Sequence, residues 1–77
     1  MSKPFVQAGT FSVEANAKSA ANKIRRNGMS AEVLELKSDD KSVWRVLVGP
    51  VATRTERRAL LNDVKDLGFT DAFTAKN

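Results

Sequence analysis

Few side chains in this sequence could take part in catalysis. The chain has no histidine and no cysteine, which excludes imidazole and thiolate chemistry and the common zinc sites. The adjacent carboxylates Asp39 and Asp40 lie in the polar stretch KSDDKS, which is typical of a turn. The stretch QAGTFS lacks the glycines and the lysine of a phosphate-binding loop. We therefore expect no enzymatic activity, no metal site and no cofactor.

Gln7 and Arg45 remain as candidates for chemistry, because each stands in an otherwise apolar run. Gln7 lies in FVQA and Arg45 lies in WRVLV. Strands rarely bury an amide or a guanidinium without a partner, and a glutamine side chain both donates and accepts hydrogen bonds. Gln7 is therefore either a solvated strand residue or part of a sheet face that binds a ligand.

An internal repeat predicts the elements that position these residues. Gly9 and Gly49 each follow an apolar run, and a second glycine, Gly28 or Gly68, lies 19 residues further on in each case. The chain thus repeats strand, glycine turn, helix, glycine stop and strand with a period of 40 residues. Apolar spacing predicts helices at about 13–27 and 54–67 and strands at about 4–9, 30–36, 43–48 and 70–75.

The ends of the predicted helices carry suitable capping residues. Ser12 is expected to cap the first helix. In the second helix, Thr53 and Glu56 have the spacing of a capping box. Gly28 and Gly68 fit the left-handed position that closes a helix.

Two such halves joined by a hairpin predict an α+β fold of the split βαβ, or ferredoxin-like, type, β-α-β-β-α-β. Both helices are expected on one face of a four-stranded antiparallel sheet, so that the other face is open. Alternation along the strands places Val6, Ala8, Trp44, Val46 and Val48 in the core. It places the following residues on the open face: Phe5, Gln7, Gly9, Val43, Arg45, Leu47 and Phe73.

Apolar and aromatic groups on an open sheet face favour a binding surface over plain solvent exposure. Two questions stay open at this point. The first is which face each residue of AEVLEL occupies, and whether a bulge or slip in this second strand shifts the alternation. The second is whether Phe5 and Phe11 border a ligand or wrap the edge of the core.

Length and charge narrow the possible roles. The chain has 77 residues, so we expect a single domain over 1–77, with a core at about 5–75, excised from a larger protein. It has neither a hydrophobic signal segment nor a membrane-length apolar run. The net charge of +4 suits a polyanionic partner or simply solubility. Arg54, Arg57 and Arg58 are interpreted as a solvated helix face.

Four stretches together resemble a SPOR domain: FVQAGTFSVEANA, NGMSAEV, WRVLVGPV and LGFTDAF. The resemblance covers about residues 5–75 and implies the same fold. It also implies binding without catalysis. The expected partner is the denuded glycan strand of peptidoglycan, from which the stem peptides have been removed. The expected location is the division septum, in the bacterial periplasm and cell envelope. We expect a monomer, with no membrane contact within this segment and no nucleic acid partner.

The resemblance also implies the residues that bind the glycan. Gln7 and Arg45 match the family's motif residues, Thr10 stands where serine is usual, and Phe73 occupies an apolar position of the ligand face. The full set of expected glycan-binding residues is Gln7, Thr10, Arg45, Phe73, Phe5, Val43 and Asn16, in which Val43 replaces a tryptophan of some relatives. Arg45 is hypothesised to bind the lactyl carboxylate of muramic acid, which is free once the peptide is gone.

Two other functions are compatible with the predicted fold. An RNA-binding module of this fold stacks bases on sheet aromatics, whereas RVLVGP carries aliphatic residues. A protein-docking or small-molecule regulatory domain would use a helix face or a sheet edge, and an obligate dimer would favour it.

Overall fold

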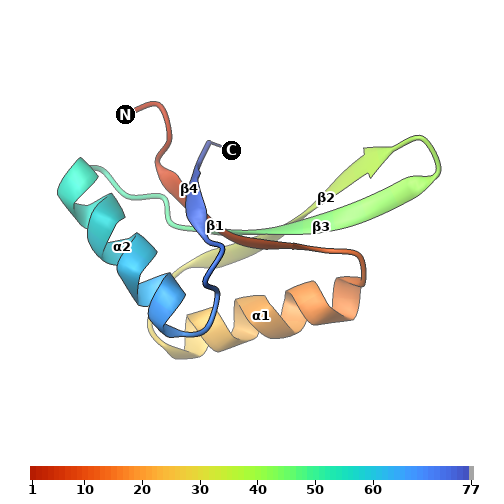
Figure 1. Ribbon diagram of the computed structural model, residues 1–77, viewed down its shortest axis with the longest axis horizontal. Coiled ribbons are helices and arrows are strands. Elements are labelled where there is room, and N and C mark those ends of the chain that lie inside the picture. The colour runs from red at the N-terminus through yellow and green to blue at the C-terminus, as the bar shows by residue number, and fades with distance from the viewer. Residues whose placement is uncertain (77) are drawn as a thin grey trace.

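The computed structural model describes residues 1–76 and contains four strands and two helices (Figure 1). The elements are β1 (Phe5–Phe11), α1 (Glu14–Arg26), β2 (Ala31–Ser38), β3 (Lys41–Val48), α2 (Arg54–Asp66) and β4 (Phe73–Ala75). The strand order in the sheet is β2-β3-β1-β4, and each neighbouring pair is antiparallel. The predicted split βαβ fold is therefore confirmed.

Both helices cover the same face of the sheet (Figure 1). α1 packs on β2 and β3, and α2 packs on β1 and β4. Small alanines on α1 allow this helix to approach the sheet closely, with Ile24 fully buried at its end. The core cluster consists of Val6, Ala8, Ala17, Ala20, Ala21, Ile24, Ala31, Val46, Val48, Val64 and Ala72. Trp44 and Phe11 are partly buried against it, so Phe11 belongs to the core side.

The second helix begins as predicted and the first does not. The hydroxyl oxygen of Thr53 accepts a hydrogen bond from the backbone N–H of Glu56 at 3.1 Å, and its O–H donates to Glu56 Oε1 at 3.0 Å. Ser12, in contrast, does not cap α1. Because β1 continues to Phe11, the N-cap position falls on Val13, which makes no side-chain capping bond.

Gly9 is not the turn that the repeat predicted. It lies inside β1, at a shift in register between Gln7 and Gly9. A Cβ atom on Gly9 would lie 3.2 Å from the Phe11 ring, so glycine here makes room for that ring. The corresponding Gly49 does end its strand, with φ of 114° and Pro4 O within 3.2 Å of a Cβ built on it. The two halves therefore differ at this position.

The hairpin between β2 and β3 is longer and more regular than expected. Its register is continuous from Ala31↔Val48 to Ser38↔Lys41, without a bulge. Asp39 adopts a positive φ of 54° in the turn. The hairpin extends beyond the helices (Figure 1). β4 is shorter than predicted, since the backbone N–H of Ala72 bonds Phe69 O in a turn that precedes it.

Candidate functional site

The open face of the sheet brings together the residues that the sequence singled out. Thr10 on β1 lies directly opposite Arg45 on β3. Gln7 on β1 lies opposite Leu47 on β3 and, on its other side, opposite Phe73 on β4. Directly paired residues point to the same side of a sheet. Gln7, Thr10, Arg45 and Phe73 therefore share one face, the face that carries no helix.

A β-bulge in β1 makes this arrangement possible. Gln7 and Thr10 are three residues apart, so in a regular strand they would point to opposite faces. Ala8 is the extra residue at the register shift between Gln7 and Gly9. Because it has no partner on β3, the alternation shifts by one residue after it, and Thr10 points to the same face as Gln7. As a result Gly9 lies opposite Val46 and Phe11 opposite Trp44. The prediction that Gly9 faces outward was therefore wrong.

The polar side chains of this face form a chain of hydrogen bonds. Arg45 Nε donates to Gln7 Oε1 at 2.9 Å. Gln7 Nε2 donates to Thr10 Oγ1 at 2.9 Å. Arg45 Nη2 also donates to the backbone carbonyl of Lys76 at 3.2 Å. The amide of Gln7 thus fixes the positions of both Arg45 and Thr10.

Gln7 is buried, which corrects its interpretation as an exposed amide. Only 7% of its surface is accessible, because Phe73 and Leu47 flank it in the sheet and Arg45 is bonded to it. The polar side chains that a ligand can reach are therefore Arg45 and Thr10, which are hydrogen-bonded to Gln7. Thr10 is exposed, and its oxygen already accepts a hydrogen bond, so its own O–H is available to donate. Arg45 is half-buried and keeps N–H groups beyond the two that are used.

Apolar side chains surround this polar chain. Phe73 is 52% exposed and lies next to Gln7, on the β4 side of the polar chain. Towards the hairpin, Val43 pairs with Leu36, which is 54% exposed. Both line a hollow of about 510 Å³ that reaches the hairpin turn. Phe5 pairs with Ala75 at the other end of the face and is half-buried.

Leu34 and Leu36 are members of this face that sequence reasoning did not assign. They lie opposite Arg45 and Val43 respectively. The available signal was the parity of AEVLEL, because placing Ala31 and Val33 on the core side puts both leucines on the open side. Asn16, in contrast, is not brought to this face. It is exposed on α1, in the helix layer, away from the strands that carry the other residues.

Two further observations concern the whole described chain. Within residues 1–76, no group of three or more acidic, histidine or cysteine residues is placed to hold a metal ion. Neither of the two helices in this range has the length and apolar character needed to cross a membrane.

Comparison with known proteins identifies the family. A family model described as SPOR domain matches residues 2–75. No curated protein and no solved structure matches the chain. SPOR domains are in general non-catalytic, peptidoglycan-binding domains of the bacterial periplasm and septum, with a role in cell division. Because the matched range spans almost all of the 77 residues, this chain belongs to the SPOR domain family.

Proposed function

We propose that this domain binds denuded glycan strands on the open face of its sheet and so targets its parent protein to the division septum. The observation that carries this proposal is the hydrogen-bonded chain from Arg45 through Gln7 to Thr10, next to the exposed ring of Phe73. It joins a cation, a hydroxyl and an aromatic surface on one accessible face.

Each of these groups suits a different part of a glycan strand. The ring of Phe73 offers an apolar surface to the C–H face of a sugar. Thr10 donates from its hydroxyl to a sugar hydroxyl or acetamido oxygen. Arg45 binds the lactyl carboxylate of muramic acid, and such charge-assisted bonds are stronger than neutral ones. Val43 and Phe5 border the ligand on the two sides.

The carboxylate contact also explains a preference for denuded strands. In intact peptidoglycan the stem peptide is joined to the lactyl group through an amide, so the charge is absent and the peptide occupies the space above the sheet. Removal of the peptide exposes a free acid. Gln7 acts here as a positioning residue, because it holds the guanidinium by Nε and leaves Nη1, together with the second N–H of Nη2, to face the ligand.

Binding to purified cell-wall sacculi, with and without amidase treatment, tests this proposal. We expect the domain to bind amidase-treated sacculi more tightly than untreated ones. Arg45→Ala should reduce this binding by at least about tenfold, which corresponds to the loss of one hydrogen bond to a charged group. Arg26→Ala removes the same charge from the exposed end of α1 and serves as the matched control. Failure to bind amidase-treated sacculi would contradict the proposal.

A further inference from the structure

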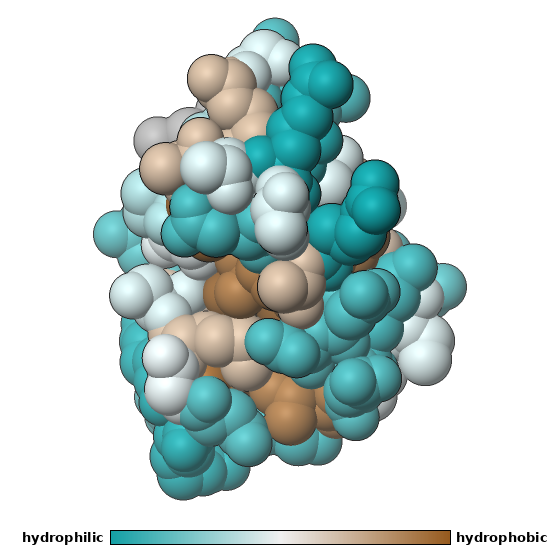
Figure 2. All heavy atoms as spheres, turned by 90° about the vertical axis from the view of Figure 1, so that its left-hand side faces the viewer, coloured by the Kyte–Doolittle hydropathy of each residue, from teal (hydrophilic) through white to brown (hydrophobic). Residues whose placement is uncertain are grey.

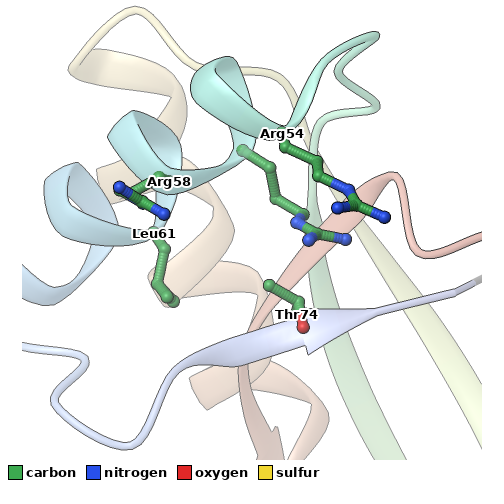
Figure 3. Close-up of a pocket in the computed structure, with 5 residues that line it drawn as sticks. Arg54, Arg58, Leu61 and Thr74 are labelled. Atoms are coloured by element: carbon green, nitrogen blue, oxygen red, sulfur yellow. The ribbon is translucent and has the colours of Figure 1, made fainter. Parts of the chain in front are cut away.

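A second hollow lies between α2 and β4, on the helix-covered side of the sheet (Figure 3). Its volume is about 330 Å³, and its lining consists of Arg54, Arg57, Arg58, Leu61 and Thr74. Successive strand residues point to opposite faces, so Thr74 faces α2 while Phe73 faces the glycan side. This hollow and the proposed glycan surface therefore share no residue.

The hollow gathers three arginines that pair with no carboxylate among the described residues. Within residues 1–76, Lys18 and Glu14 form the one ion pair closer than 4.0 Å. None of the three arginines is therefore paired with an acid in this range. The neighbouring acid Glu56 is bonded to Thr53 instead. Like charges at helix spacings of three and four repel one another. An anionic ligand would relieve this repulsion.

The arginines are held at different points around the hollow. Arg57 is half-buried, and its Nη1 donates to the backbone carbonyl of Lys3 at 3.1 Å. Arg54 and Arg58 are exposed and lie on two sides of the hollow (Figure 3). Leu61 extends from α2 towards β4, the strand that carries Thr74 (Figure 3). Arg54 is also the first residue of α2, where the positive end of the helix favours an anion.

We propose that this hollow is a second binding site and that its ligand carries a phosphate group. A guanidinium donates two parallel hydrogen bonds to a phosphate, and the several phosphate oxygens accept from more than one arginine. The hydroxyl of Thr74 supplies a further donor. Leu61 offers an apolar wall to the organic part of a phosphate ester.

The lining of the hollow suits a polar ligand, because four of its five residues are arginines or threonine. Seen from the side of α2, hydrophilic side chains cover most of the surface, and apolar groups show only in limited areas between them (Figure 2). A phosphate group could come from a soluble phosphate ester or from a lipid headgroup. The chemistry of recognition at the arginines is the same for both sources.

An NMR titration of the ¹⁵N-labelled domain tests this inference and separates the two sources. Glycerol 3-phosphate provides the soluble ester, and phosphatidylcholine vesicles containing phosphatidic acid provide the lipid. Sodium chloride at matched ionic strength and pure phosphatidylcholine vesicles are the controls. We expect saturable changes at the amide signals of Thr74 and Arg54. Saturation by the ester assigns the site to a soluble ligand, and saturation by the vesicles alone assigns it to a lipid headgroup; either supports the site.

Matched variants distinguish a site from general attraction. Arg54→Gln should weaken the binding by about tenfold, the effect of one hydrogen bond to a charged group. Arg26→Gln, which removes the same charge from α1, should change it by less than about twofold. Equal effects of the two variants, or signal changes reproduced by chloride, would overturn the inference. Arg54→Gln should also bind amidase-treated sacculi like the wild type, and a loss there would refute the claim that the two sites are separate.

Discussion

The hydrogen bond between Arg45 and Gln7 allows the proposed charge contact to be tested without removing Arg45. Gln7→Glu is nearly isosteric and keeps the acceptor that holds Arg45 Nε, now as a carboxylate, while the hydroxyl of Thr10 turns to donate to it. It places a negative charge beside the guanidinium and therefore offsets the charge that a glycan carboxylate would meet. Since the new carboxylate is paired with Arg45, we expect the unfolding free energy to change by less than about 2 kcal/mol.

The size of the binding effect follows from the geometry. Arg45 Nε lies 2.9 Å from Gln7 Oε1. A ligand carboxylate bonded to the terminal nitrogens would lie on the other side of the guanidinium, roughly 7 Å from the new carboxylate. Two charges at that separation repel by about 0.6 kcal/mol in water and about 2.4 kcal/mol at an effective dielectric constant of 20. An intermediate penalty of about 1–2 kcal/mol weakens binding roughly 5- to 30-fold.

Fluorescence anisotropy with a labelled denuded glycan strand measures this change, and urea unfolding measures stability on the same samples. Asn62→Asp makes the same change from amide to acid on the exposed surface of α2 and should leave glycan affinity within about twofold of wild type. A folded Gln7→Glu variant with wild-type affinity would show that Arg45 does not bind a carboxylate of the glycan. A loss of affinity accompanied by unfolding would trace the defect to stability instead.

Three further substitutions test the fold and the binding face. Thr53→Ala should lower the unfolding free energy by about 1 kcal/mol, whereas Ser12→Ala, which removes no capping bond, should change it by less than about 0.5 kcal/mol in the same urea experiment. Gly9→Val should cost about 1–3 kcal/mol, because even its Cβ would lie 3.2 Å from the ring of Phe11; an unchanged unfolding midpoint would show that the ring moves aside freely. Phe73→Ala should weaken glycan binding by about two- to tenfold and, since the ring is 52% exposed, should leave the melting temperature close to that of wild type.

The layout of the fold could be predicted from the sequence because it rests on periodic patterns. Apolar residues at helical spacing placed both helices within one or two residues of their observed ends. The capping box at Thr53 and the glycines that close the helices depend on neighbours in the sequence, so they too were predictable. The cap at Ser12 failed because it depends on where β1 ends, and pairing with β3 extends that strand to Phe11.

Part of the open face was predictable from the sequence, whereas Leu34, Leu36 and the contacts between its side chains were not. Alternation correctly placed Arg45 and Phe73 on the open face. The burial of Gln7 could not be read from alternation, since it arises from neighbours on β3 and β4 that lie far away in the sequence. The hollow beside α2 could not be predicted from the sequence either, because it forms only where Thr74 of the last strand lies near the arginines of α2.

The bulge in β1 explains why a glutamine, a glycine and a threonine stand together in QAGT. If Ala8 took a regular place in the ladder, Thr10 would point towards the helices, and Gln7 would have no hydroxyl to bind. With it, Thr10 comes to lie opposite Arg45, and one amide holds both groups. The same shift turns Phe11 towards Trp44, and the missing side chain of Gly9 gives the Phe11 ring its space. Core packing and the proposed binding face are thus linked through one local irregularity, so a substitution that removed the bulge should damage stability and glycan binding together.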